Sequence, residues 1–376
     1  MPGSERASKQ LLLVGGGHSH VAVLRSLGER PLPGVSATLV SPERFTPYSG
    51  MLPGLVAGHY EHRECHIDLA ALARFARCTL VEDTVTGLDL PRRVAAIAGG
   101  GERKWDVISL DIGSTPQTAG VPGAREWAIA VKPVHRLLAA LQDLVAGSRR
   151  GVVRRVLFVG GGAASVEVLL ALQHHLSAAG GQRVEMVLAS DGDMPLAGHN
   201  ARVRAIFARV LADRRVRVHA RSRIVRVEPE SALTDTGERI GFDALIWATG
   251  AGAVAWPGKS GLAVDPDGFV LVDETLQSVS HERVFAAGDI ATMRGHPRPK
   301  SGVYAVRHGP PLTRNIRRAL AGERLERFVP QRDALTLIST GDRYAVMSLG
   351  RWALQGAWVW CWKDWIDRRF MRRYAF

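Results

Sequence analysis

The chain has 376 residues, of which 46% are hydrophobic and 23% charged, as expected of a globular protein with about two to three domains. Its three cysteines, Cys65, Cys78 and Cys361, form no CxxC pair, which argues against a disulfide framework and a structural zinc site. The formal net charge of +13 favours an anionic partner, such as a nucleotide or an acidic membrane surface.

The first predicted unit is a strand at 11–16 followed by a helix at 18–29, with the turn Gly15-Gly16-Gly17 between them. A second strand is expected at 37–41. The first glycine of such a turn permits its tight geometry, and the free N–H groups of the helix start attract phosphate. A glycine-rich turn in this context predicts a Rossmann dinucleotide site.

The next segment connects this unit to a second one. Residues 44–60 are rich in Pro and Gly and are expected to form a loop, and 117–131 a linker. The regular elements expected between them and after them are a helix at 68–76, strands near 78–97, a buried strand from 105 that ends at Gly113, and a helix at 133–146.

The second unit repeats the plan of the first about 145 residues later. Here the turn is Gly160-Gly161-Gly162, and a later apolar strand ends at Gly250 as the earlier one ends at Gly113. The elements expected here are a strand at 155–159, helices at 163–178 and 199–212, and strands at 183–189, near 216–228 and at 242–249. Two such turns predict two dinucleotides and electron transfer between them.

The last part of the chain contains a third glycine signal and a tryptophan-rich end. An apolar strand from 284 ends in Gly288-Asp289, and a loop at 291–302 leads into a helix at 302–320. Trp358, Trp362 and Trp365 fall on one face of a final helix, together with Ile366. Interleaved arginines and Lys363 make this helix a candidate for contact with a membrane surface. Packing on the protein's own core or in a homo-oligomer interface is the alternative.

The sequence contains no recognisable targeting segment. The sequence shows no secretory signal and no apolar run of 18 residues, which predicts a cytoplasmic protein, with the inner face of the cell membrane as a further location.

These segments in this order resemble the pyridine nucleotide-disulfide oxidoreductase superfamily, whose members are flavoproteins that bind two dinucleotides. Within it the chain is more similar to the type II NADH dehydrogenase and sulfide:quinone reductase branch. GGGHSHVAVL, YSGMLPGLVAGHY, SLDIGSTP, PKSGVYAVRHGPP and WKDWIDRRFMRRY most resemble the flavoprotein half found fused to selenide, water dikinase.

The resemblance implies an α/β fold with two Rossmann-like domains and a short C-terminal amphipathic region. The FAD-binding domain would comprise 1–128 and 265–330, the NAD(P)-binding domain 129–264, and the C-terminal region 331–376. FAD would bind at the first glycine turn and NAD(P)H at the second. Ser41 and Ser190 stand where an acid usually holds a ribose, which leaves NADH and NADPH open.

The resemblance also implies roles for individual residues. Glu167 would lie near the nicotinamide and the flavin, Tyr48 would line the flavin, and Lys300 would stabilise the anionic reduced flavin. No metal ligand is expected. The residues expected to bind the two cofactors are Gly15, Gly17, His18, Ser41, Arg44, Val85, Gly113, Lys132, Gly160, Gly162, Gly250, Gly288, Asp289, Gly302 and Val303.

The leading prediction is therefore an FAD-dependent NAD(P)H dehydrogenase that passes electrons to a quinone-like acceptor. No CxxxxC follows the first unit, which disfavours dithiol chemistry. One alternative is a flavoprotein that oxidises sulfide or a selenium compound through a cysteine such as Cys65. Another is a non-catalytic basic flavoprotein that binds a partner or nucleic acid, although no nucleic-acid motif is present.

Overall fold

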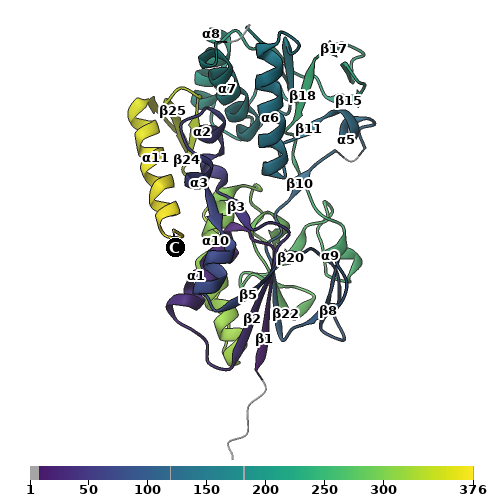
Figure 1. Cartoon of the computed structure of the whole chain (residues 1–376), viewed down its shortest axis with the longest axis vertical. Coiled ribbons are helices and arrows are strands. Elements are labelled where there is room, and N and C mark those ends of the chain that lie inside the picture. Colours follow the sequence, from purple (N-terminus) through teal and green to yellow (C-terminus); the bar gives the residue numbers. More distant parts are fainter. Residues whose placement is uncertain (1–7, 119, 181–182, 376) are drawn as a thin grey trace, which may run out of the picture.

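The computed structural model describes residues 8–118, 120–180 and 183–375. Two sheets, each flanked by helices, form the two halves of the molecule (Figure 1). The larger sheet has eight strands in the order β23-β20-β21-β22-β9-β1-β2-β5. These strands are β1 (Lys9–Val14), β2 (Val35–Val40), β5 (Cys78–Val81), β9 (Val107–Leu110), β20 (Val270–Val272), β21 (Gln277–Ser278), β22 (His281–Ala286) and β23 (Ala291–Met293).

The larger sheet is parallel around its centre, where β1 pairs with both β2 and β9. The chain winds from β1 to β2 on one side and crosses to β9 on the other, so the strand order reverses beside the end of β1. Such a reversal point opens a crevice at the carboxyl ends of the strands, which is where ligands bind in open α/β sheets. The first glycine turn lies at this end of β1.

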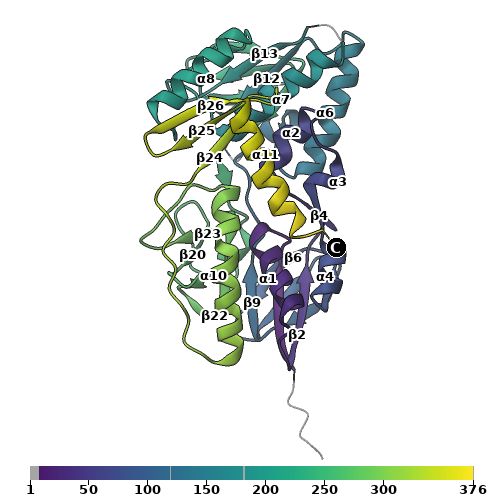
Figure 2. The same ribbon diagram turned by 90° about the vertical axis from the view of Figure 1, so that its left-hand side faces the viewer.

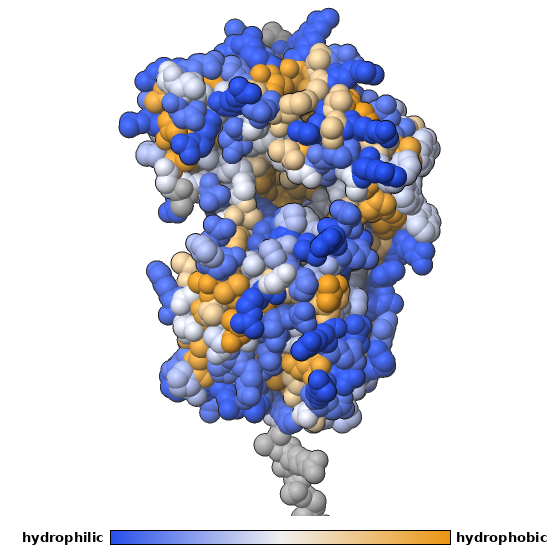
Figure 3. Space-filling model, turned by 180° about the vertical axis from the view of Figure 1, so that it is seen from behind, coloured by the Kyte–Doolittle hydropathy of each residue, from blue (hydrophilic) through white to orange (hydrophobic). Residues whose placement is uncertain are grey.

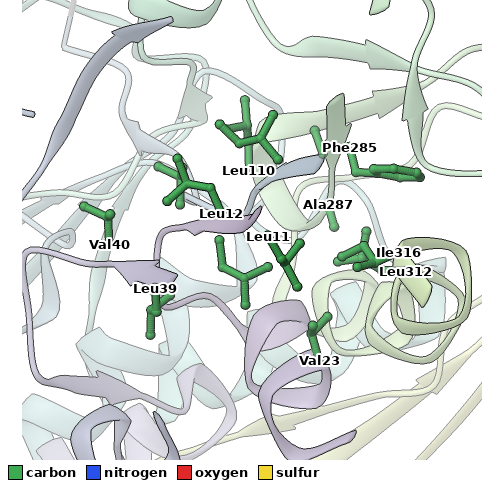
Figure 4. Close-up of a cluster of buried hydrophobic side chains, with 14 of the residues drawn as sticks. Leu11, Leu12, Val23, Leu39, Val40, Leu110, Phe285, Ala287, Leu312 and Ile316 are labelled. Atoms are coloured by element: carbon green, nitrogen blue, oxygen red, sulfur yellow. The ribbon is translucent and has the colours of Figure 1, made fainter. Parts of the chain in front are cut away.

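Helices α1 (His18–Glu29) and α10 (Gly302–Ala321) lie side by side on one face of this sheet (Figure 2). Leu11, Leu110 and Phe285 from the strands pack with Leu312 and Ile316 of α10 in a continuous apolar core (Figure 4). α4 (Leu69–Phe75) also contacts α1 and begins at the N-cap Asp68. This burial holds α1 in place, so the position of its N-terminus is set by the core.

The smaller sheet is fully parallel and repeats the same plan, with the order β11-β18-β12-β13-β14. It reverses between β12 and β18, beside the second glycine turn. Its strands and helices are β11 (Ile129–Ala130), β12 (Arg155–Val159), β13 (Glu185–Ala189), β14 (Arg217–His219), β18 (Ala244–Trp247), α6 (Val134–Arg149), α7 (Ala163–Ala178) and α8 (Ala201–Asp213).

Both halves also contain short helices and strands outside the two main sheets. The segment 44–60, which we expected to be a loop, contains β3, η1 and α2, because β3 pairs antiparallel with β4 and α2 packs on α7. The minor elements are β3 (Phe45–Pro47), η1 (Ser49–Met51), α2 (Leu52–Val56), α3 (His62–Cys65), β4 (His66–Asp68), β6 (Val85–Asp89), β7 (Val94–Ile97), β8 (Glu102–Lys104), β10 (Thr115–Pro116), α5 (Ala124–Trp127), β15 (Ile224–Val227), β16 (Ser231–Thr234), β17 (Arg239–Gly241), β19 (Ala251–Gly252), α9 (Trp256–Lys259) and η2 (Gly288–Ile290).

The C-terminal part forms a three-stranded antiparallel sheet of β24 (Thr336–Ser339), β25 (Ala345–Leu349) and β26 (Trp352–Gly356), followed by α11 (Ala357–Arg372). This sheet lies against α8, and α11 runs back across the junction of the two halves (Figure 2). Within the described residues, no helix combines the length and apolar character that crossing a bilayer requires.

Candidate dinucleotide-binding site

Both glycine turns require a first glycine for the same reason. Gly15 has φ +91° and Gly160 has φ +118°, a region that side-chain-bearing residues rarely adopt. A Cβ at Gly15 would come closer than 3.0 Å to the backbone of Asp111, and one at Gly160 would do the same to Ala248. Each turn therefore packs closely on the backbone that follows the strand across the reversal point, which is β9 in the first half and β18 in the second.

The surroundings of the third glycine of each turn differ between the two halves. A Cβ at Gly162 would meet no atom within 4 Å, so this position leaves its side of the turn open to a ligand. At Gly17, in contrast, the place of a Cβ is filled by the carboxyl group of Asp111. The openness at Gly162 fits the approach of a pyrophosphate, whereas the first turn already contains an acidic group.

This difference predicts opposite effects of two alanine substitutions. Gly15→Ala should destabilise the fold by more than about 2 kcal/mol, because it combines a positive φ with overlap against backbone. Gly162→Ala should change the unfolding free energy by less than about 0.5 kcal/mol but raise the KM for the nicotinamide cofactor. Urea unfolding and steady-state kinetics measure the two effects. A large loss of stability in Gly162→Ala would contradict the open turn.

The predicted cofactor residue Asp289 lies in a polar cluster at the end of β22. Its Oδ2 accepts hydrogen bonds from Nζ of Lys132 at 2.9 Å and from Oγ of Ser114 at 3.1 Å. Its Oδ1 is buried and has no hydrogen-bond partner, and the same is true of Nε2 of His18. Buried polar atoms without partners are rare in folded proteins and mark a place for an external group. The hydroxyl groups of a flavin's ribityl chain fit this requirement.

The loop at Tyr48 lies between the first turn and the C-terminal helix. The Tyr48 ring stacks on Phe370 of α11 with centroids 4.3 Å apart and lies 5.5 Å from the His18 ring. Burial lowers the pKa of His18 to about 4, so its ring is neutral. Gly302, the first residue of α10, has no room for a Cβ because Ser49 Oγ is there. The structure thus brings together His18, Tyr48 and the start of α10.

Lys300 precedes α10 and is half-buried. Its Nζ donates to the carbonyl of Ala291 at 2.7 Å and to Oγ1 of Thr292 at 2.8 Å, and it lies 3.9 Å above the Phe269 ring. Burial lowers the pKa of Lys300 to about 8. Together with Gly288 and Asp289 it lines a small cavity. The lysine therefore lies beside the Gly-Asp motif, with its amino group held by β23.

Other predicted contact residues lie at the rim of the site. Ser41 is buried beside Gly16, and its hydroxyl donates to the carbonyl of Glu43 at 3.0 Å. Arg44 is exposed and pairs with Asp68 at 2.9 Å. Val85 is buried in β6 within the core of the larger sheet, and Val303 is partly buried in the first turn of α10. Gly113 has open space beside it, while Gly250 is exposed near Gln117.

Glu167, the fifth residue of α7, faces the C-terminal region. Its Oε1 accepts the backbone N–H of Ser339 in β24 at 2.7 Å. Burial raises the pKa of Glu167 to about 7, against the opposing influence of nearby Lys363. A carboxyl group with this pKa can carry and release a proton at neutral pH.

Lys363 itself is 8% exposed and faces inward from α11. Its Nζ donates to Oδ2 of Asp367 at 2.6 Å and to the carbonyl of Gly50. Asp367 also interacts with Tyr48, whose pKa burial raises strongly. Lys363 and Asp367, which are buried, and Glu167 and Tyr48, which are partly buried, form one polar group, which we call the junction cluster.

The sequence analysis missed Asp111 and the inward position of Lys363 and Asp367. The sequence pattern placed Lys363 among cations at a membrane surface, but Trp358, Trp362 and Trp365 occupy the outer face of α11 and the charged pair the inner one. The available signal was the spacing of Lys363 and Asp367, which lie four residues apart on one helix face, with Trp365 between them in the sequence. For Asp111 the signal was the comparison of Leu110-Asp111-Ile112-Gly113 with Trp247-Ala248-Thr249-Gly250.

Figure 3 shows a hollow between the two halves, with apolar surface inside it, on the face opposite to that of Figure 1. A strand-turn-helix with a glycine turn in each half is shared with a known protein family. The model of the pyridine nucleotide-disulphide oxidoreductase family matches residues 9–309. The chain belongs to this family. Membership confirms the predicted α/β fold class and the cofactor class, FAD with NAD(P)H, for which the family's two turns are built.

Several curated relatives carry related names. An NADH dehydrogenase-like protein of Mycobacterium tuberculosis is 27% identical over 258 residues, which cover 66% of this chain and 64% of that protein. A type II NADH:quinone oxidoreductase of Haemophilus influenzae is 26% identical over 206 residues, covering 52% and 46%. The chain thus matches somewhat less than two thirds of the length of the first of these relatives.

Solved structures share the whole fold. The NDH2 of Plasmodium falciparum in complex with NADH superimposes with a TM-score of 0.82 over 98% of this chain and 97% of that one, at 13% identity. The sulfide:quinone oxidoreductase of Aquifex aeolicus gives 0.80 over 97% and 91%, at 16% identity. At these identities the likeness establishes the architecture, including the C-terminal part that the family model does not cover.

Proposed function

We propose that this protein is an FAD-dependent NAD(P)H dehydrogenase that reduces a quinone-like acceptor. The observation that carries the proposal is the junction cluster, where the charges of Lys363 and Asp367 of α11 influence the carboxyl of Glu167 in the second dinucleotide unit. Quinone reduction needs protons as well as electrons, and the cluster offers a protonatable carboxyl between the two turns. The names of the curated relatives support the same reaction.

Each part of the site has an expected role in this reaction. Bound FAD supplies two-electron transfer chemistry. The turn at Gly160 and Gly162 would hold the NAD(P)H pyrophosphate, and the turn at Gly15 with Asp289 would hold FAD. Glu167 would donate a proton toward the acceptor, and Lys363 would hold the carboxyl of Asp367 and the Gly50 carbonyl so that the loop at Tyr48 stays closed against α11.

The cysteines favour a quinone over sulfide or a selenium compound as the reacting partner. Burial raises the pKa of the Cys65 thiol and of the Cys78 thiol to about 12, so neither supplies a thiolate near neutral pH. Cys361 is exposed on the outer side of α11. Unchanged turnover in Cys65→Ser would agree with this, and a loss of turnover would favour the sulfide or selenium alternative.

The test of the proposed reaction is anaerobic stopped-flow absorbance near 450 nm. Mixing with NADH or NADPH should bleach the flavin colour, and a soluble quinone added afterwards should restore it. Bleaching by sulfide with none by either nicotinamide would overturn the proposal. Comparison of the two nicotinamides would also settle the preference that Ser190 leaves open.

We further propose that α11 and the sheet of β24–β26 contact a membrane surface, where quinones are found. Trp358 and Trp365 are 55% and 54% exposed, and Trp352 and Leu354 add exposed apolar area nearby. Tryptophan suits the headgroup region, and arginines such as Arg369 and Arg372 suit anionic lipid. The cytoplasmic face of a cell membrane would match this charge.

Sedimentation with vesicles of phosphatidylcholine and phosphatidylglycerol tests the contact. The double variant Trp358→Ala/Trp365→Ala should bind at least about tenfold more weakly, which corresponds to a loss of about 1.4 kcal/mol. Trp127→Ala is the matched control, because Trp127 is similarly exposed on the other side of the molecule. Equal binding by wild type and the double variant would contradict the proposal.

A further inference from the structure

Asp111 is a buried acid that the proposed reaction does not use. It follows β9, is 3% exposed, and its Oδ2 accepts the backbone N–H groups of Ser19 at 2.8 Å and His20 at 3.0 Å. These N–H groups belong to the first turn of α1, the helix start at which a dinucleotide phosphate is expected to bind. An acid therefore already occupies part of the anion-binding end of this helix.

The same carboxyl group joins the two FAD motifs. It fills the place of a Cβ at Gly17, in the first turn, and its Oδ1 fills the place of a Cβ at Gly288, in the Gly-Asp motif. The two motifs are more than 270 residues apart in the sequence. Any group held between them must share that space with Asp111.

The internal repeat shows that the fold itself does not need this acid. Gly15 packs on the carbonyl of Asp111 as Gly160 packs on the carbonyl of Ala248, so Asp111 and Ala248 are equivalent positions. The second turn forms the same strand-turn-helix with a methyl group there. The acid is thus specific to the turn that faces FAD.

The surroundings of Asp111 disfavour its negative charge. Burial is the main cause of a pKa raised to about 7; the hydrogen bonds from the backbone N–H groups of His20 and Ser19 oppose this rise, and the charge of Asp289 adds to it. Around it, α1 contributes His18 and His20 and α10 contributes His308, and burial lowers the pKa of all three to about 4, so they are neutral. Lys132 already pairs with Asp289, and Lys300 is held by β23.

We propose that Asp111 is an FAD-binding residue that acts as a neutral acid, so that FAD binding at the first turn takes up a proton. The dianionic pyrophosphate and a charged Asp111 would repel each other at one helix start, whereas a neutral carboxyl can donate a hydrogen bond to a phosphate oxygen. The proton comes from the solvent and is bound by the carboxylate. This inference rests on the FAD site of the proposed function.

FAD affinity is expected to depend on pH through the protonation of Asp111. Below pH 7 Asp111 is already protonated in the free protein, so FAD binding takes up no proton there. Above pH 7 the free protein carries Asp111 as a carboxylate, and each bound FAD must bring a proton with it. The affinity for FAD should therefore fall about tenfold per pH unit above pH 7 until the pKa of the complex is reached.

Isothermal titration calorimetry of FAD into the full chain, freed of FAD, counts these protons when buffers of different ionisation enthalpy are compared. Wild type should take up close to one proton at pH 8 and none at pH 5.5. Asp111→Asn keeps the acceptor oxygen and Asp111→Ala copies Ala248, and both should take up about one proton fewer than wild type at pH 8, whatever Lys300 contributes in all three proteins. Asp106→Asn, at the opposite end of β9, is the matched control and should behave as wild type.

Two outcomes would overturn the inference. The first is no proton uptake by wild type at pH 8, which decides the matter even if the variants fail to fold. The second is unchanged uptake in a folded Asp111→Asn. If FAD binds tightly in either case, only this inference fails. A chain that binds no FAD at all would overturn the FAD site of the proposed function as well.

Discussion

Lys363→Met is expected to lower the free energy of unfolding by about 3–5 kcal/mol, the range found when one partner of a buried ion pair is removed. Lys363 and Asp367 have side chains only 10% and 6% exposed, and the 2.6 Å pair lies between α11 and the loop at Tyr48. Without the lysine, the carboxyl of Asp367 and the carbonyl of Gly50 lose their buried partner. Urea unfolding followed by circular dichroism measures the change.

Two controls separate this effect from a general cost of substitution. Arg92→Met removes an ion pair with Glu102 whose side chains are 62% and 47% exposed, and it should cost less than about 1 kcal/mol. The double variant Lys363→Met/Asp367→Leu removes both charges and should recover much of the stability. Equal losses in Lys363→Met and Arg92→Met would show that the junction cluster is not a buried pair in solution.

Glu167→Gln is expected to slow acceptor reduction by about 10²-fold, the lower end of the contribution of a positioned proton donor. Reduction of the protein by NAD(P)H should change by no more than about threefold, because the amide keeps the size of the side chain and can still accept the N–H of Ser339. Stopped-flow measurement of the two half-reactions distinguishes these effects. Equal slowing of both would assign Glu167 to nicotinamide binding instead.

The pH dependence of acceptor reduction is a second test of the role of Glu167. Its pKa is raised to about 7, so the proton that it donates is lost as the pH rises through this value. Acceptor reduction by wild type should therefore decline above pH 7, and the decline should be absent in Glu167→Gln. FAD must be kept in excess during this measurement, because Asp111 is expected to weaken FAD binding over the same pH range.

The order of elements and the two glycine turns could be predicted from the sequence. Strand and helix periodicity are local properties of the chain, and the helices expected at 163–178 and 302–320 correspond closely to α7 and α10. The requirement for glycine at Gly15 and Gly160 is also local, because it follows from the tight turn between a strand and a helix. Family membership then follows from the sequence.

The charged interior could be decided only by the tertiary structure. Along the chain, Lys363 and Asp367 are two polar residues of a tryptophan-rich helix, and nothing local says which face is buried. The antiparallel sheet of β24–β26 turns α11 back over the junction. Its charged face then contacts Gly50 and lies near Glu167, while Trp358, Trp362 and Trp365 face outward. Whether a residue is buried depends on which remote segments cover it. Local periodicity along the chain does not reveal those segments.

Asp111 shows the same division between sequence and structure. The sequence alone determined that this protein has two dinucleotide turns, an α/β fold and the residues that make the turns tight. The packing of β9 between β1 and β22 decided that the carboxyl of Asp111 lies against Gly17, Gly288 and the start of α1. Its protonation depends on being enclosed by segments from both ends of the chain, since desolvation is a property of the assembled fold.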